Sequence, residues 1–127
     1  MKMQRIMVVD DQPADQMLAR YAIQRYNPDA EIFEALDGFE ALTILKNLET
    51  PPDIIFLDIN MPRMNGFEFL EAYSSSTPQA QIIVMLTSSE QESDRQKCAA
   101  YDFVAAYETK PISAQILKQL EERHYAR

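Results

Sequence analysis

Polar side chains stand at or just beyond the ends of the most apolar stretches of the sequence. They belong to Asp10, Asp11, Asp58, Thr87 and Lys110. Three carboxylates gathered at one place repel each other unless a cation joins them. Carboxylate and water oxygens suit Mg²⁺, and a bound Mg²⁺ also takes phosphate oxygens. If a fold brings these residues together, they would form a magnesium site suited to phosphoryl chemistry.

The other groups fit the same chemistry. The ammonium of Lys110 can pair with a phosphoryl group or with a free aspartate, and the hydroxyl of Thr87 can donate a hydrogen bond to a phosphoryl oxygen. An aspartate among such groups can act as a nucleophile and form an acyl phosphate. Asp58 is the best candidate because it directly follows four apolar residues.

The apolar stretches predict the strands of a parallel sheet. Four of them are apolar at consecutive positions, which indicates burial on both faces; they cover residues 6–9, 54–57, 82–86 and 103–106. A fifth stretch, 31–35, carries charges and is typical of an edge strand. Ligands bind at the carboxyl ends of parallel strands, so the polar groups would meet at that edge.

Helical patterns lie between these stretches. The first begins at Pro13 and has apolar residues at the spacing of one helix face: Ala14, Met17, Leu18, Tyr21 and Ala22. Others begin near residues 41, 67 and 89, the last with a capping-box pattern, and a final helix includes 116–120. The alternation predicts one α/β domain over residues 1–127. We expect a flavodoxin-like (βα)5 fold with a parallel five-stranded sheet in the order 2-1-3-4-5 and helices on both faces.

Composition narrows the classes of function. The chain has 127 residues, 46% of them hydrophobic, and a formal net charge of −8. We expect no nucleic-acid partner, because such proteins carry a basic patch. We expect no membrane contact, because no apolar run approaches the ~20 residues that span a bilayer. The single cysteine, Cys98, excludes an internal disulfide, and the N-terminus lacks a signal-peptide pattern, so a cytoplasmic location is the simplest.

Four segments of the sequence resemble the receiver domains of two-component response regulators, including the stand-alone chemotaxis type. The resemblance covers essentially the whole chain and depends on residues 8–11, 55–66, 86–88 and 107–112. Each segment alone is weak, but their order and their places at strand ends make a strong combined signal. The resemblance implies a phosphoryl-accepting switch that uses Mg²⁺, and not an enzyme that acts on a separate substrate.

The resemblance also implies roles for single residues. Asp58 matches the phosphoacceptor, and Asp11 and Asp58 match direct Mg²⁺ ligands. The backbone carbonyl of Asn60 matches a third ligand, while Asp10 is expected to act mainly through water. Lys110 matches the lysine that contacts the phosphoryl group.

Two residues match the family's switch. Thr87 is expected to move toward the phosphoryl group, and Tyr107 to turn inward when it does. The Lys110–Pro111 peptide bond is expected to be cis, and Gly66 is expected where a Cβ would hinder the backbone.

The resemblance implies partners as well. The phosphoryl donor would be a phosphohistidine of a sensor histidine kinase or of a histidine phosphotransfer protein, and the domain would dephosphorylate itself. Output would pass by protein–protein contact to a downstream target. The expected contact face combines the fourth helix (90–100), the last strand and the last helix.

Other interpretations stay open. Asp10 and Asp11 could only cap a helix, and the Lys-Pro pair could be an ordinary turn. A small Mg²⁺ phosphatase would need an acid where Asn60 stands, and a flavin carrier would need a phosphate-binding first loop where the sequence has acids. A degenerate receiver used only for protein contacts would not require the complete acidic set.

Overall fold

The predicted sheet is present, with its strands in the expected order. The protein is described by a computed structural model over residues 3–75, 82–87, 96–97, 100–101 and 104–125. Its strands are β1 (Arg5–Val9), β2 (Glu31–Ala35), β3 (Ile54–Asp58), β4 (Ile82–Thr87) and β5 (Val104–Thr109). All pair in parallel in the order β2-β1-β3-β4-β5, which confirms the flavodoxin-like topology and the edge position of the charged strand β2.

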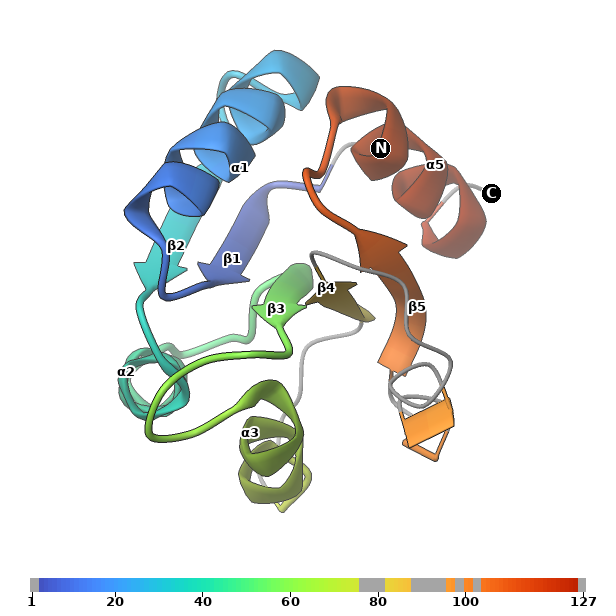
Figure 1. Cartoon of the computed structure of the whole chain (residues 1–127). Coiled ribbons are helices and arrows are strands. Elements are labelled where there is room, and N and C mark those ends of the chain that lie inside the picture. The colour runs from blue at the N-terminus through green and yellow to red at the C-terminus, as the bar shows by residue number, and fades with distance from the viewer. Residues whose placement is uncertain (1–2, 76–81, 88–95, 98–99, 102–103, 126–127) are drawn as a thin grey trace.

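Helices cover both faces of the sheet. They are α1 (Pro13–Tyr26), α2 (Gly38–Lys46), α3 (Gly66–Tyr73) and α5 (Ala114–His124). Figure 1 shows α1 and α5 together on one face, and α2 and α3 on the other. The predicted helix over 90–100 lies largely outside the described residues, and so do its capping box and Cys98. No helix that the structure describes combines the length and apolar character needed to cross a membrane.

Successive residues of the inner strands point alternately into two separate hydrophobic layers. On β1, Ile6 and Val8 pack with Ile23 of α1 and Leu117 of α5. The side chains between them face the other way and pack with α2 and α3. All these β1 residues are at most 1% exposed. Burial on both faces is therefore the reason that the strands read as unbroken apolar runs.

The buried face of α1 differs from the predicted one. The helix begins at Pro13 as expected, but Met17, Leu18 and Tyr21 are more than half exposed. The residues that the helix buries are Gln16, Ala19, Ala22, Ile23 and Tyr26. Ala22 is therefore the one buried residue of the predicted face, and the buried Gln16 donates to carbonyl oxygens at the sheet edge.

Gly66 is required by a close approach of two backbone segments. A Cβ on Gly66 would lie 2.7 Å from the carbonyl oxygen of Asp58 and 2.9 Å from the Cα of Ile59. The Gly66 amide donates a hydrogen bond to the Ile59 carbonyl at 2.8 Å. This confirms the expectation for Gly66 and shows that α3 starts directly against the end of β3.

Replacing Gly66 by alanine should lower the free energy of unfolding by about 2 kcal/mol. The new methyl group would clash with backbone atoms of Asp58 and Ile59, which cannot move without shifting the end of β3. Urea unfolding followed by circular dichroism measures this change.

Gly38→Ala is the matched control. Its Cβ would meet mainly the Sδ and Cγ atoms of Met64, at 2.6 and 2.8 Å, and these atoms can move by rotamer changes. We expect a loss below about 1 kcal/mol. Equal losses in both variants would contradict the role given to the backbone contact at Gly66.

Candidate functional site

The residues that the sequence singles out meet at the carboxyl edge of the sheet. Asp58 is the last residue of β3, Thr87 is the last residue of β4, and Asp10 directly follows β1. Strands β1 and β3 are neighbours, as are β3 and β4. The Lys110 amide donates to the Thr87 carbonyl at 2.8 Å, which holds the chain leaving β5 beside the end of β4. The sheet therefore brings together residues that are far apart in sequence.

Three carboxylates form a compact cluster at this edge. Asp10, Asp11 and Asp58 each offer an oxygen, and the three oxygens lie within 4.8 Å of one another. Asp10 is 1% exposed and Asp58 is 4% exposed. A small all-oxygen donor set that leaves room for water and phosphate is the kind that Mg²⁺ prefers, so the residues fit the expected ion.

Helix capping does not explain the aspartate pair. The N-cap residue of α1 is Gln12, and its side chain makes no capping hydrogen bond. Asp10 Oδ1 accepts a hydrogen bond from the Gln12 amide at 3.0 Å, outside the helix. The Gln12 side-chain amide donates to Asp11 Oδ2 at 3.2 Å. These bonds orient the carboxylates at the sheet edge.

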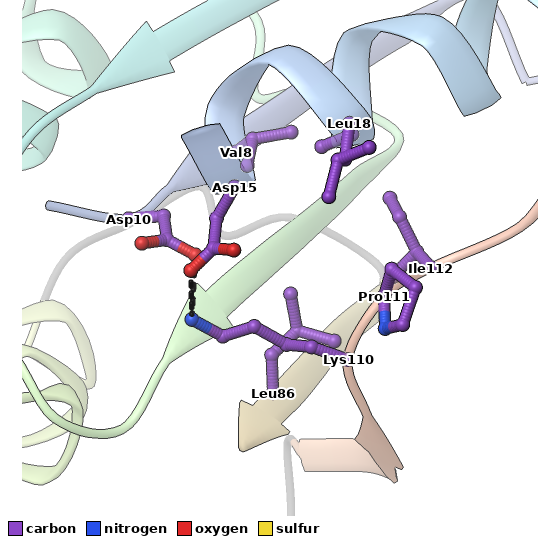
Figure 2. A pocket seen from close by; sticks show the side chains of 9 residues that line it. Val8, Asp10, Asp15, Leu18, Leu86, Lys110, Pro111 and Ile112 are labelled. Atoms are coloured by element: carbon purple, nitrogen blue, oxygen red, sulfur yellow. Dashed lines mark hydrogen bonds and ion pairs between the residues drawn. The ribbon is translucent and has the colours of Figure 1, made fainter. Parts of the chain in front are cut away.

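The ammonium of Lys110 lies inside the cluster. Its Nζ is 2.8 Å from Asp10 Oδ2, 2.9 Å from Asp15 Oδ2 and 3.4 Å from Asp58 Oδ2. The Lys110 side chain is 13% exposed, and Figure 2 shows it reaching toward the carboxylates of Asp10 and Asp15. The Lys110–Pro111 peptide bond is cis, as expected. Lys110 thus pairs with two buried carboxylates, those of Asp10 and Asp58, and with the partly exposed carboxylate of Asp15.

Burial and mutual repulsion determine the protonation of this network. Burial, with the nearby charge of Asp10 as a second cause, raises the pKa of Asp58 to about 6 against the opposing effect of Lys110. Burial also raises the pKa of Asp10, although Lys110 again opposes it. For Lys110, burial alone would lower the pKa, but hydrogen bonds to Asp10 and Asp15 outweigh it and raise the pKa. The carboxylates therefore remain crowded even with the ammonium among them.

Sequence reasoning missed two residues of the network, both on α1. Asp15 is the third carboxylate on Lys110. Gln16 is buried, and its side-chain amide lies 2.9–3.1 Å from the carbonyl oxygens of Val8, Asp10 and Ala35. Gln16 thereby ties the end of β1 to the end of β2. The only available signal was a glutamine within the first helix pattern, and its role depends on tertiary contacts.

Contacts with α2 hold the loop after Asp58. Arg63 has a left-handed φ of 65°, which is uncommon for a residue with a side chain. Its guanidinium pairs with Asp37, the N-cap of α2, and lies 5.6 Å from the ring centre of Phe39. The loop that follows the candidate acceptor is therefore anchored at its midpoint.

The remaining predicted residues lie close by. The Asn60 amide donates to Asp58 Oδ1 at 3.4 Å, while the ligand role of its carbonyl stays a prediction. Thr87 is 1% exposed. Tyr107 is partly buried against the hydrophobic layer that faces α2 and α3, and it stands opposite Met85 in the β4–β5 register. The predicted switch residues, Thr87 and Tyr107, therefore lie on the neighbouring strands β4 and β5.

Asp58→Asn should stabilise the metal-free protein by about 1 to 3 kcal/mol at pH 7.5, because it removes a buried charge from a crowded site. The pKa of Asp58 is about 6 in the folded protein and 3.8 as an isolated side chain. The wild-type free energy of unfolding therefore falls as pH rises from about 4 to 6 and levels off above that range. The variant should match the wild type near pH 4.

Urea unfolding at the two pH values, in the presence of a chelator, measures this difference. The matched control is Asp29→Asn, because Asp29 is exposed near the other end of α1. If Asp58→Asn is no more stable than the wild type at pH 7.5, the Asp58 charge does not destabilise the metal-free protein.

Several known proteins are similar to this chain in sequence or in fold. A protein-glutamate methylesterase/protein-glutamine glutaminase 3 of Geobacter sulfurreducens is 33% identical over 122 residues, but this chain spans only 32% of its length. PilG of Pseudomonas aeruginosa is 32% identical over 118 residues, covering 89% of this chain and 81% of PilG. The crystal structure of a two-component response regulator from Cytophaga hutchinsonii is similar over 100% of both chains, with a TM-score of 0.87 and 27% identity. Residues 6–121 match the family model of the response regulator receiver domain, and the chain belongs to that family.

Proposed function

We propose that this receiver domain is a signalling switch that accepts a phosphoryl group on Asp58 from a phosphohistidine. One observation carries the proposal. Asp58 lies within a cluster of carboxylates at the carboxyl edge of the sheet, with the Lys110 ammonium 3.4 Å from its Oδ2. Phosphoryl transfer depends mainly on positioning and charge neutralisation, and a carboxylate held beside an ammonium supports both.

The proposed transfer is a simple displacement. A carboxylate oxygen of Asp58 attacks the phosphorus, a P–O bond forms, and the P–N bond to the donor imidazole breaks. The imidazole nitrogen keeps the electron pair and takes a proton from solvent. In the reset, water attacks the phosphorus, the P–O bond to Asp58 breaks, and inorganic phosphate leaves with the oxygen of the water.

The chain's residues divide this work. Mg²⁺, when bound, would neutralise charge on the phosphoryl oxygens. Asp11, Asp58 and the carbonyl of Asn60 would hold it directly, and Asp10 through water. Lys110 would contribute one N–H to a phosphoryl oxygen from the opposite side.

The signal would leave through a change in two residues. Thr87 at the end of β4 would move toward the phosphoryl group, and Tyr107 of β5 would turn inward. The proposed output face includes β5 and α5 together with the predicted fourth helix. Among the described residues, the large exposed apolar side chains lie elsewhere, on α1 and near the start of α2: Met17, Leu18, Tyr21, Leu36 and Phe39.

The wider setting follows from the same proposal. A sensor histidine kinase or a histidine phosphotransfer protein would be the donor, and a protein would be the target. The cytoplasm is the compartment that fits such partners. The domain would act on its own aspartate and not as an enzyme on a separate substrate.

Incubation with Mg²⁺ and acetyl phosphate or phosphoramidate should add one phosphoryl group to the wild type and none to Asp58→Asn, because the amide is a poor nucleophile. Intact-mass spectrometry measures the addition. Asp29→Asn is the control and should label like the wild type, because Asp29 is exposed and away from the site. Labelling that persists in Asp58→Asn would assign the acceptor elsewhere, and an unlabelled wild type would favour a degenerate receiver.

Mg²⁺ should raise the melting temperature of the wild type, because a ligand that binds only the folded state stabilises it. At ten times its dissociation constant, the gain is about 1.4 kcal/mol. Asp11→Asn should lose most of this gain, since it removes one of the three clustered carboxylates. Calorimetric titration and thermal unfolding measure both effects, and an equal gain in Asp11→Asn would place the ion at other groups.

A further inference from the structure

Asp15 reaches into the site from α1. It is the third residue of that helix, and its Oδ2 accepts a hydrogen bond from Lys110 Nζ at 2.9 Å. Figure 2 marks this bond and shows the carboxylates of Asp10 and Asp15 facing the same ammonium. Asp15 is not part of the carboxylate cluster that offers oxygens to a cation. Its contact within the site is therefore with the lysine.

We propose that Asp15 is a positioning residue that orients the Lys110 ammonium toward the phosphoryl group on Asp58. The inference rests on the proposed function, because it gives Asp15 a part in that reaction. It makes α1 a component of the reaction site and not only a cover for the sheet.

The geometry of the ammonium supports this role. A lysine has three N–H donors on a flexible four-carbon stem. Two short hydrogen bonds, at 2.8 Å to Asp10 and 2.9 Å to Asp15, use two of the donors. The third contact, to Asp58 Oδ2, is longer at 3.4 Å. With two donors held, the third is directed at the acceptor, and its longer distance leaves it available to a phosphoryl oxygen.

The lysine stem is guided as well. Leu86, Pro111, Ile112 and Leu18 line a small cavity with Lys110 and Asp15, and the Lys110 side chain is 13% exposed. Apolar walls confine the stem but cannot select a rotation of the ammonium. That selection requires acceptors on two sides, which Asp10 and Asp15 provide from different elements.

Two other effects of Asp15 give different outcomes. An acid in the first turn of a helix stabilises it through the helix dipole, which would change stability but not phosphorylation. A negative charge near the site would also repel an anionic donor, so its removal would speed phosphorylation. A positioning role predicts the opposite change in rate, because removing the Asp15 carboxylate would slow phosphorylation at saturating donor.

The experiment compares three substitutions in the full chain, with Mg²⁺ and acetyl phosphate. Asp15→Ala removes the acceptor, Asp15→Asn keeps an acceptor oxygen without the charge, and Asp15→Glu keeps both on a longer side chain. We expect Asp15→Ala to lower the saturating rate about fivefold, with little change in the half-saturating donor concentration. Asp15→Asn should fall between it and the wild type, and Asp15→Glu should recover part of the rate.

Two controls separate positioning from structure. Glu40→Ala removes an acid from the first turn of α2, and it should leave the phosphorylation rate within twofold of the wild type. In a Lys110→Ala background, Asp15→Ala should have no further effect, because it acts through the lysine. A full fivefold loss in that background, or in Glu40→Ala, would overturn the proposal, as would an unchanged or faster rate in Asp15→Ala.

A second measurement does not depend on phosphorylation. ¹³C relaxation of the Lys110 Cε should show a lower order parameter in Asp15→Ala than in the wild type, because the ammonium loses one anchor. An unchanged order parameter would overturn the positioning role. If the wild type takes no phosphoryl group from any donor, the proposed function fails, while this relaxation measurement still decides whether Asp15 holds the lysine.

Discussion

Crowding of buried carboxylates around a single ammonium is the constraint on which the rest of the structure depends. Asp10 and Asp58 are almost completely buried, and Lys110 lies within 3.4 Å of both. Burial raises the pKa of each carboxylate, which means that ionising Asp10 and Asp58 costs stability. A dication held between the carboxylates would reduce this repulsion.

The scaffold tolerates this cost because two apolar layers surround the sheet. Each inner strand contributes side chains to both layers, which keeps the strand ends in place while their last residues carry charge. Local devices secure the edge. Gln16 ties the ends of β1 and β2 together, the close contact at Gly66 holds α3 against β3, and Arg63 anchors the intervening loop to α2.

Helix α1 shows how a sequence pattern can identify an element but misplace its face. The spacing of Met17, Leu18 and Tyr21 correctly predicts a helix, yet these side chains are exposed. The helix instead buries Gln16, whose side-chain Nε2 lies within hydrogen-bond distance of three carbonyl oxygens at the sheet edge. This orientation of α1 about its axis also places Asp15 beside Lys110. Both departures place polar side chains of α1 against the carboxyl edge of the sheet, where they meet backbone carbonyls and the Lys110 ammonium.

Local sequence patterns were sufficient to predict the strand order, the parallel topology of the sheet, the helices α1, α2, α3 and α5, and the acidic and basic residues at the carboxyl edge. These follow from local patterns, since unbroken apolar runs predict doubly covered parallel strands and polar residues mark where the runs end. Which carboxylates share the ammonium, and which face of α1 is buried, depend on how the folded segments pack against one another. Those features depend on distances between segments that are remote in sequence, and no local pattern records such distances.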